Sequence, residues 1–317
     1  MAIKDYLWVE KYRPTHVKDI VLPAKFSKFF GDIVKNGETP NLLLHSSVPG
    51  SGKTALSKAL VNDLNADHLY INISSESGID TLRSSISNFA MTKSITMRPK
   101  VVIMDEADGA TAQLQAGLRA AIEEYHRHCR FILTCNYISK IIPPLREGRV
   151  MQFDFNMTDN ATREEMIPKV LRRLEGILNN ENIEYDKDTL KKLVERDYPS
   201  IRKMVSTLQK FSSMYGHIGP ELITTTIVDD KLYALVNAKK FSEAREMIIK
   251  NNYDIGELYP AFYRDFVPTL KGMAEQCPTI LTLAKYQAQH PNAIDPELNF
   301  AACLLEIIQG LIEARGN

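Results

Sequence analysis

A lysine and a threonine preceded by glycines form the clearest chemical pattern in this sequence. Residues 47–54 read Ser-Val-Pro-Gly-Ser-Gly-Lys-Thr, after a short apolar run and before a segment with helical spacing. In such a loop Gly50 and Gly52 let backbone N–H groups point at phosphate, Lys53 pairs with the outer phosphates and Thr54 offers a magnesium ligand. The strand-to-helix context predicts a nucleotide site made of Pro49, Gly50, Ser51, Gly52, Lys53, Thr54 and Ala55.

Two adjacent carboxylates and an amide follow other apolar runs. Asp105, after the run 101–104, would hold magnesium through water, and Glu106 can polarise the water that attacks the γ-phosphate. Asn136 ends a further run, so its amide would lie at the same sheet edge and could hydrogen-bond the phosphate and the water. An acidic strand end alone is often a solvated cap, and asparagine also suits a plain turn. Together with the phosphate loop, however, these residues predict nucleotide hydrolysis, with Lys53, Glu106 and Asn136 as catalytic residues.

Strands alternating with helices must position these residues. Short continuous apolar runs indicate strands buried on both faces, as in a parallel sheet. The intervening segments carry helical spacing. The predicted fold is therefore an α/β, doubly wound parallel sheet. The four runs are at 42–44, 69–71, 101–104 and 131–133.

After residue 155 the sequence contains almost none of the short apolar runs that predict strands. A capping pattern at Thr162 opens a helix, and two further helical patterns follow it. Pro168 should kink that first helix or delay its start, and the sequence leaves both alternatives open. The turn-like stretch 216–220 marks a candidate linker before another helical region. We predict an α/β domain at 1–157, a small helical lid domain at 158–226 and an all-α domain at 227–317.

Charge and composition exclude several classes of protein. The 39 Lys and Arg balance the 39 Asp and Glu, so no global positive field attracts nucleic acid and any contact with it must be local. No segment approaches the roughly 18 continuous apolar residues of a membrane span, and residues 1–11 lack the apolar core of a signal peptide. We expect a cytoplasmic protein. The four cysteines form no C-x-x-C pair, which argues against a zinc module and favours reduced thiols in the core.

The phosphate loop, the paired carboxylates and Asn136, in this order, resemble the AAA+ ATPases. Three stretches narrow the resemblance to clamp-loader ATPase subunits, because they are similar to the WVEKYRP box, the NASDERGID stretch and the Q-x-A-L-R…E-x-Y helix of the replication factor C small-subunit family. Ser47, in place of a glycine, and residues 20–24 look like the T4-type bacteriophage large subunit, with an archaeal or eukaryotic small subunit as the alternative. The three stretches are residues 8–14, 72–80 and 115–125, and the resemblance covers roughly residues 6–210.

This resemblance implies an activity, cofactors and partners. The cofactors would be ATP and Mg2+. Other copies of the chain and a small clamp-loader subunit would form a five-membered ring that acts on a ring-shaped sliding clamp and on primer-template DNA, away from any membrane. ATP binding would open the clamp and hydrolysis would release it, in the cytoplasm of a bacterial host if a phage encodes the chain. A helical C-terminal domain would form a collar, although core packing within one subunit explains the apolar segment 296–314 almost equally well.

The resemblance also assigns roles to further residues. An arginine that reaches the neighbouring subunit's γ-phosphate would be Arg149, or alternatively Arg146, because the usual S-R-C motif is broken here. Arg202 matches a sensor arginine on the lid. The adenine side of the pocket would be formed by Tyr12, Arg13, Val21 and Leu22, and DNA phosphates would meet Arg83 and the helix that begins near Thr111.

Two other functions fit parts of the pattern. A stator subunit that binds nucleotide without cleaving it would suit the broken arginine motif, whereas the intact Asp105 and Glu106 argue against it. An AAA+ helicase or protein remodeller would normally carry an aromatic-apolar-Gly triplet in a pore loop, and residues 84–99 contain none.

Overall fold

The computed structural model describes residues 6–74, 79–92, 99–226, 230–251 and 253–316. The chain separates into two compact units, Met1–Ile218 and Gly219–Asn317. The boundary falls inside the predicted linker at 216–220. No helix among the described residues is long and apolar enough to cross a membrane.

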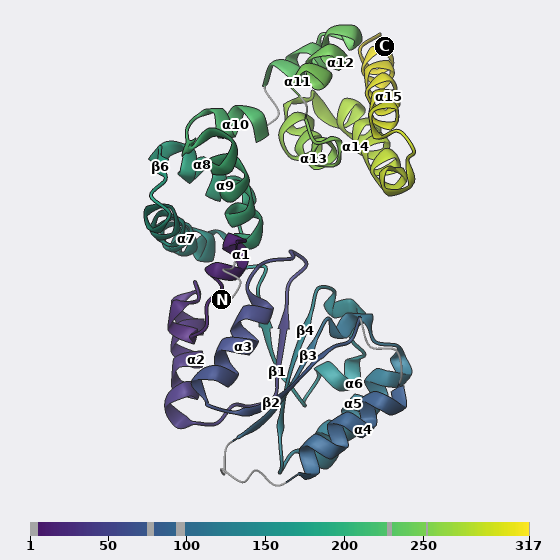
Figure 1. Cartoon of the computed structure of the whole chain (residues 1–317). Helices are drawn as coiled ribbons and strands as arrows, with labels where there is room; N and C mark the ends of the chain where they lie inside the picture. Colours follow the sequence, from purple (N-terminus) through teal and green to yellow (C-terminus); the bar gives the residue numbers. More distant parts are fainter. Residues whose placement is uncertain (1–5, 75–78, 93–98, 227–229, 252, 317) are drawn as a thin grey trace. The chain divides into compact units, whose positions relative to one another are not determined.

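A five-stranded parallel sheet organises the first unit (Figure 1). The strand order is β2-β3-β4-β1-β5, which confirms the predicted doubly wound α/β fold. β5 was not predicted, because it is a short edge strand whose residues are mostly exposed and so lack a continuous apolar run. The strands are β1 (Leu42–His45), β2 (Asp67–Asn72), β3 (Lys100–Asp105), β4 (Arg130–Cys135) and β5 (Met151–Asp154).

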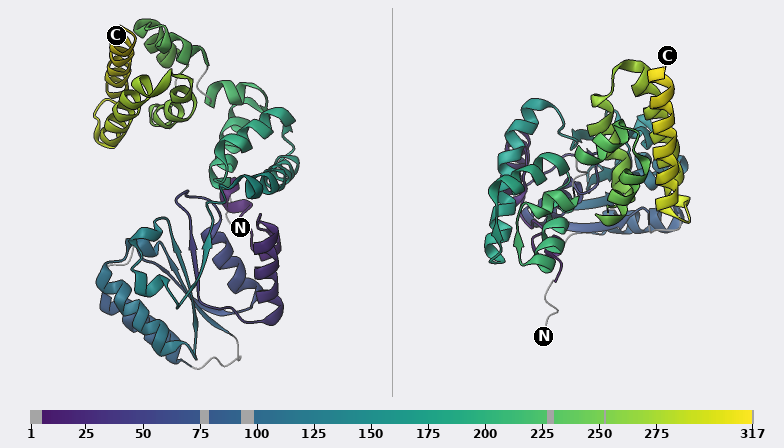
Figure 2. Two further views of the ribbon diagram at one scale, coloured as in Figure 1. Left: turned by 180° about the vertical axis from the view of Figure 1, so that it is seen from behind. Right: turned by 90° about the horizontal axis from the view of Figure 1, so that it is seen from above.

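Helices cover both faces of this sheet. α2 (Ala24–Asn36) and α3 (Lys53–Asp63) lie on one face, and α4 (Ile79–Met91), α5 (Ala112–Tyr125) and α6 (Pro143–Arg146) lie on the other (Figures 1 and 2). The apolar spacing predicted for α5 is confirmed, since Leu114, Leu118 and Ile122 are buried against the sheet. Both sheet faces are therefore sealed, and only the strand ends remain to build a site. Short helical turns complete the domain: α1 (Trp8–Lys11), η1 (Val17–Asp19), η2 (Ala107–Gly109) and η3 (Ile138–Lys140).

A helical lid follows β5 in the same unit. It comprises α7 (Asn160–Asn180), β6 (Glu184–Tyr185), α8 (Lys187–Asp197), α9 (Ile201–Tyr215) and β7 (His217–Ile218). The predicted cap at Thr162 was wrong by one turn: the Asp159 carboxylate accepts a hydrogen bond from the Thr162 N–H at 2.9 Å and caps α7. Pro168 lies inside α7, so it does not delay the start of the helix.

The second unit is helical in all of its described elements. Its core is built from aromatic side chains, among them Tyr259, Phe262, Phe266 and Phe300. α15 buries one face there and leaves Leu298, Leu305 and Ile312 exposed at seven-residue spacing. The elements are α10 (Glu221–Thr226), α11 (Asp230–Asn237), α12 (Phe241–Lys250), α13 (Ile255–Ala261), η4 (Phe262–Phe266), η5 (Val267–Thr269), α14 (Gly272–Gln289), η6 (His290–Asn292) and α15 (Pro296–Gly316).

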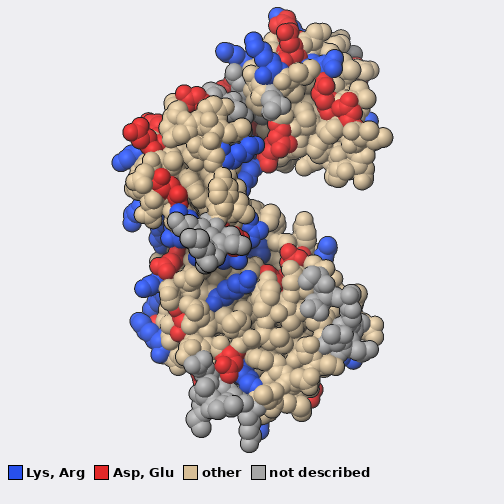
Figure 3. All heavy atoms as spheres, viewed as in Figure 1, with Lys and Arg blue, Asp and Glu red and all other residues tan. Residues whose placement is uncertain are grey.

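Surface charge is mixed on both units. Basic and acidic side chains lie among one another on the face shown in Figure 3, in keeping with the net charge of zero. Cys129, Cys135 and Cys303 are buried as predicted, whereas Cys277 is exposed on α14, so the prediction of core thiols was wrong for that residue.

Candidate nucleotide site

A cavity of about 380 Å³ lies at the carboxyl ends of the strands in the first unit. The loop between β1 and α3, the N-terminal segment, the ends of β3 and β4, and the lid helices α7 and α9 line it. The structure thus brings together Tyr12, Arg13, Val21, residues 49–55, Asp105, Glu106, Asn136 and Arg202. It does not bring Leu22 to this cavity, because Leu22 is buried in the core at 2% exposure and Ile20 and Val21 form this wall instead.

The phosphate loop has the backbone that its glycines predict. Gly50 and Gly52 take φ angles of 80° and 102°, in the left-handed region that glycine adopts without strain, and α3 begins at Lys53. The Lys53 Nζ lies 3.2 Å from the Ser46 carbonyl oxygen, and burial lowers the pKa of this ammonium group. The Ser51 hydroxyl is buried without a hydrogen-bond partner in the described part of the chain. The loop therefore holds a buried cation and an unpaired hydroxyl, which suits an anion.

Ser47, which replaces the usual first glycine, has a partner that explains its presence. Its hydroxyl donates to the Asn156 side-chain oxygen at 2.8 Å, and its backbone N–H donates to the same oxygen at 2.9 Å. Asn156 follows β5, the edge strand beside β1. The serine thus anchors the start of the phosphate loop to the neighbouring strand.

Asp105 accepts hydrogen bonds from three hydroxyl groups. Thr54 Oγ1 lies 2.8 Å from Asp105 Oδ1, the Tyr70 hydroxyl lies 2.6 Å from Oδ2, and Thr134 Oγ1 also donates to Oδ1. Asp105 itself is only 7% exposed. A threonine hydroxyl beside a carboxylate at the phosphate loop is an oxygen donor set of the kind that Mg2+ prefers, so the residues present fit this ion.

Glu106 and Asn136 follow β3 and β4 and line the same cavity. Glu106 has a φ angle of 56°, which is unusual for a residue other than glycine, and its side chain is exposed. Its backbone N–H donates to Thr134 Oγ1 at 3.2 Å. Residues held in sparsely populated conformations cluster at functional sites. The end of β3 thus places a buried carboxylate, Asp105, next to an exposed one, Glu106.

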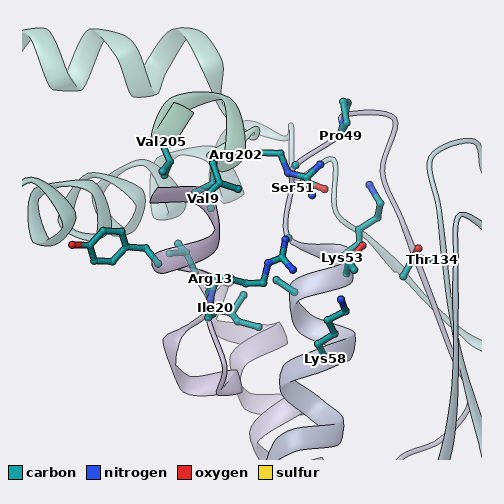
Figure 4. A pocket seen from close by; sticks show the side chains of 18 of the residues that line it. Val9, Arg13, Ile20, Pro49, Ser51, Lys53, Lys58, Thr134, Arg202 and Val205 are labelled. Carbon is teal, nitrogen blue, oxygen red and sulfur yellow. The ribbon is translucent and has the colours of Figure 1, made fainter. Parts of the chain in front are cut away.

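The lid contacts the phosphate loop directly. The Ser200 hydroxyl donates to the Pro49 carbonyl oxygen at 2.8 Å, and the Arg202 N–H lies 3.4 Å from the Gly50 carbonyl oxygen. In Figure 4 the Arg202 side chain extends from the lid toward the loop near Ser51. A β-carbon on Gly50 would lie 2.7 Å from the β-carbon of Arg202, so this contact requires glycine.

The N-terminal segment ties the opposite wall of the cavity to the lid. The Tyr12 hydroxyl donates to Glu181 at 2.5 Å, and the Arg173 guanidinium donates to the Tyr12 carbonyl oxygen at 2.8 Å. Burial, followed by the Glu181 hydrogen bond, raises the pKa of Tyr12. Apolar side chains complete this wall. They are Val9, Ile20, Val21, Ile177, Ile201 and Val205, of which Val9, Ile20 and Val205 are labelled in Figure 4.

Both candidate finger arginines lie outside their own chain's cavity. Arg149 pairs with the Glu123 carboxylate, and its Nη1 lies 3.3 Å from the Pro144 carbonyl oxygen. Arg146 ends α6, and its Nη1 lies 3.4 Å from the Ile138 carbonyl oxygen. Neither residue lines the cavity, so neither is placed to serve it from within the same chain.

The two residues predicted to contact DNA belong to α4 and α5, which cover the sheet face opposite the one that α3 covers. Thr111 caps α5 through its side chain, which accepts from the Leu114 N–H at 3.2 Å. Arg83 on α4 is exposed, and a β-carbon on Gly117 of α5 would lie 2.9 Å from its Nη2. Gly117 thus leaves room for Arg83 to lie across α5.

Some lining residues were not predicted to belong to the site. Lys58 lies one helical turn after Thr54, and this spacing could have indicated it. Thr134 lies two residues before Asn136 in β4, so it could have been found in the same way. Tyr70 and Arg173 carry no local signal, because only long-range packing places them here.

Comparisons with known proteins agree with this geometry. Residues 43–158 match the ATPase family associated with various cellular activities (AAA). Residues 162–224 match the AAA+ ATPase lid domain of the sliding-clamp-loader large subunit. The chain is 33% identical to the sliding-clamp-loader large subunit of Enterobacteria phage T4 over 276 residues, covering 84% of this chain and 85% of that protein.

The chain belongs to the clamp-loader family of AAA+ ATPases. The corresponding subunit of Escherichia phage RB69 is 36% identical over 212 residues, which cover 66% of each protein. The replication factor C small subunit of Sulfurisphaera tokodaii is 37% identical over 252 residues, covering 78% of this chain and 71% of that protein. The predicted family is therefore confirmed, and membership makes the chain a nucleotide-binding ATPase.

Solved structures support the same fold. The RuvB Holliday junction branch migration motor of Thermotoga maritima superposes with a TM-score of 0.51 over 71% of this chain and 79% of that one. At 14% sequence identity this likeness concerns the AAA+ fold alone.

Proposed function

We propose that this chain is an ATPase subunit of a loader for DNA polymerase sliding clamps, and that it binds ATP with Mg2+ in the cavity described above. The observation that carries the proposal is the meeting of three features in one cavity: the buried Lys53, the Thr54–Asp105 pair and the lid arginine Arg202. The clamp-loading part of the proposal is supported by membership of the clamp-loader family rather than by the cavity.

The phosphate loop binds and orients the triphosphate. Backbone N–H groups at Gly50 and Gly52 and the N-terminus of α3 favour phosphate oxygens, and the Lys53 ammonium pairs with the outer phosphates. Thr54 would hold Mg2+ directly and Asp105 through water. When bound, the ion neutralises negative charge on the phosphate oxygens.

Glu106 is the proposed general base. Its exposed carboxylate can accept a hydrogen bond from the attacking water, while the buried Asp105 remains engaged by hydroxyl groups. Asn136 lines the same cavity and is proposed to hydrogen-bond the γ-phosphate and that water. The end of β3 would thus supply the base, and the end of β4 would supply the amide that orients the phosphate and the water.

Arg202 is proposed to sense the γ-phosphate from the lid. Because Ser200 and Arg202 contact the phosphate loop at Pro49 and Gly50, a change in the bound nucleotide acts on the start of α9. ATP and ADP would then favour different lid angles, which is how binding energy can be converted into movement.

Catalysis is proposed to require a neighbouring subunit. Arg149, or alternatively Arg146, would stabilise the charge that develops on the neighbour's transferred phosphoryl group. Both arginines lie outside their own cavity, which supports action in trans. The exposed stripe of Leu298, Leu305 and Ile312 supports a collar contact with adjoining subunits, in a five-membered ring with a small clamp-loader subunit.

ATP binding is proposed to assemble this ring on an open sliding clamp at primer-template DNA, and hydrolysis to release the closed clamp. DNA phosphates would meet the α5 N-terminus at Thr111 and the Arg83 guanidinium, which lies against the same helix. Such contacts recognise the phosphate backbone and carry no base sequence information.

ATP hydrolysis by the assembled complex tests this function. The chain would be co-expressed with the small subunit from the same genome, and phosphate release measured alone, with the clamp, with primer-template DNA and with both. We expect the clamp and DNA together to stimulate hydrolysis more than either does alone. Unchanged hydrolysis with the cognate pair would contradict clamp loading, while nucleotide binding by the isolated chain would still support the ATPase site.

A further inference from the structure

Tyr70 contacts the magnesium-binding carboxylate although it belongs to none of the sequence motifs of this site. Its hydroxyl donates to Asp105 Oδ2 at 2.6 Å, while Thr134 Oγ1 donates to Oδ1. The two hydroxyl groups thus engage different oxygens of one carboxylate. This arrangement fixes the rotation of the Asp105 side chain about its terminal bond.

The sheet explains how two hydroxyl groups reach one carboxylate. β3 lies between β2 and β4, so Asp105 has a neighbour on each side. Tyr70 pairs with Ile103 in the register between β2 and β3, two residues before Asp105, and side chains at this spacing share a face. Tyr70 therefore approaches from β2 and Thr134 from β4.

Lys58 holds the Tyr70 ring from the other side. Its Nζ lies 4.4 Å from the ring centroid, within the range of a cation–π interaction. Lys58 is on α3, one turn after Thr54, and both Lys58 and Tyr70 line the cavity. In Figure 4 Lys58 lies below Lys53 on the same helix.

We propose that Tyr70 is a positioning residue for the magnesium site, which it serves by holding the Asp105 carboxylate in the orientation that binds the ion's water. The inference rests on the proposed binding of Mg2+ with ATP. Thr54 would hold the ion through an oxygen lone pair and could still donate its proton to Asp105 Oδ1, so Tyr70 would remain the hydroxyl that engages Oδ2 from β2. Without Tyr70 the carboxylate must be ordered when the ion binds, which lowers affinity for Mg2+ by about tenfold.

The Tyr70→Phe variant tests this role, because it removes the hydroxyl and keeps the ring beneath Lys58. Binding of a fluorescent ATP analogue to the isolated chain would be followed by anisotropy, first with EDTA and then over a Mg2+ titration. We expect the Mg2+ midpoint to rise about tenfold, with metal-free affinity unchanged. Thr134→Val should shift the midpoint in the same direction, and Thr134→Ser should restore it.

Tyr233→Phe is the matched control, because the Tyr233 hydroxyl in the second unit is buried without a partner among the described residues. It should leave the Mg2+ midpoint unchanged. An unchanged midpoint in Tyr70→Phe, with wild-type thermal stability, overturns the inference about Tyr70 alone. Equal losses with and without Mg2+ overturn it too, since they assign Tyr70 to the nucleotide pocket. Absence of Mg2+-dependent nucleotide binding in the wild type contradicts the proposed function itself.

Discussion

The carboxylate of Glu123 on α5 holds the guanidinium of Arg149, which lies between α6 and β5. The hydrogen bond from Arg149, opposed by some burial, lowers the pKa of Glu123. Arg149 also donates to the Pro144 carbonyl oxygen at 3.3 Å, so its side chain is held at two points. If Arg149 is the finger, as proposed, this fixed position would let it meet a phosphate on an adjoining subunit at a low cost in side-chain entropy.

Arg149→Ala should therefore abolish most hydrolysis in the assembled ring. A finger arginine in trans contributes about a thousandfold or more to turnover, so we expect a loss of that order in kcat. ATP binding by the isolated chain should not change, because Arg149 does not line its own cavity. Steady-state phosphate release and anisotropy binding would measure the two effects. If Arg146→Ala produces the loss and Arg149→Ala does not, Arg146 is the finger.

Glu106→Gln should separate nucleotide binding from hydrolysis. The variant keeps the shape of the side chain and loses the base, so we expect turnover to fall by about 100-fold to 10,000-fold while ATP binding is retained. Lys53→Ala should instead abolish ATP binding, because it removes the buried ammonium group of the phosphate loop. Binding and single-turnover measurements on both variants would test this contrast. Ordinary hydrolysis by Glu106→Gln would remove Glu106 from its assigned role.

Gly50→Ala should weaken nucleotide binding by separating the lid from the phosphate loop. The added β-carbon would lie 2.7 Å from the β-carbon of Arg202 and 3.0 Å from the Ser200 hydroxyl, so α9 must shift. Gly37→Ala is the matched control: Gly37 has a φ angle of 73° with open space around it, so it carries the backbone strain without the clash. We expect an affinity loss of tenfold or more, about 1.4 kcal/mol, for Gly50→Ala only, because only there does the added β-carbon push α9 away from the phosphate loop. Equal affinities for the two variants would show that the lid contact does not shape the site.

The parts of this site that the sequence predicted are those encoded by neighbouring residues. The spacing of residues 47–54 and the change from apolar to acidic residues at Asp105 are local features of the sequence. They indicate where these side chains lie without any knowledge of contacts with distant segments. β1, β3 and β4 were found for a related reason, since burial on both faces requires continuous apolar runs. The expectation of burial on both faces was wrong for β2, which is an edge strand and only partly buried. The edge strand β5 was missed because its exposed residues form no continuous apolar run. The Asp159 cap was missed because the capping pattern in the sequence begins at Thr162, one turn later.

Contacts between distant segments could not be predicted. Tyr70 meets Asp105 because of the register between β2 and β3, and Asn156 meets Ser47 because β5 pairs with β1. The spacing of residues within each strand does not predict either of these two strand registers. Leu22 shows the converse error: resemblance assigned it to the adenine pocket, whereas its side chain is buried in the core and Ile20 and Val21 line the cavity instead.

An ion pair near the C-terminus is expected to make the stability of the second unit depend on pH. Arg315 donates to both oxygens of the buried Glu275 carboxylate, at 2.9 and 3.0 Å, and to the Asn237 carbonyl oxygen at 3.0 Å. The Arg315 hydrogen bonds lower the pKa of Glu275 from 4.5 to about 2. Because this pKa is lower in the folded state, the contribution to stability is complete above pH 4.5 and is lost as the pH falls toward 2.

Arg315→Ala should accordingly destabilise α14 and α15 by about 2 kcal/mol at pH 7, the scale of a charged hydrogen-bonded pair. Arg245→Ala is the control, because its partner Glu297 is exposed and such surface pairs contribute about 0.5 kcal/mol. Hydrogen–deuterium exchange of the amides in α14 and α15 would report the difference from wild type. That difference should shrink between pH 4.5 and 3 for Arg315→Ala, since protonated Glu275 loses its attraction to Arg315. A difference that stays constant across this range would show that Arg315 stabilises the helices by packing rather than by its charge.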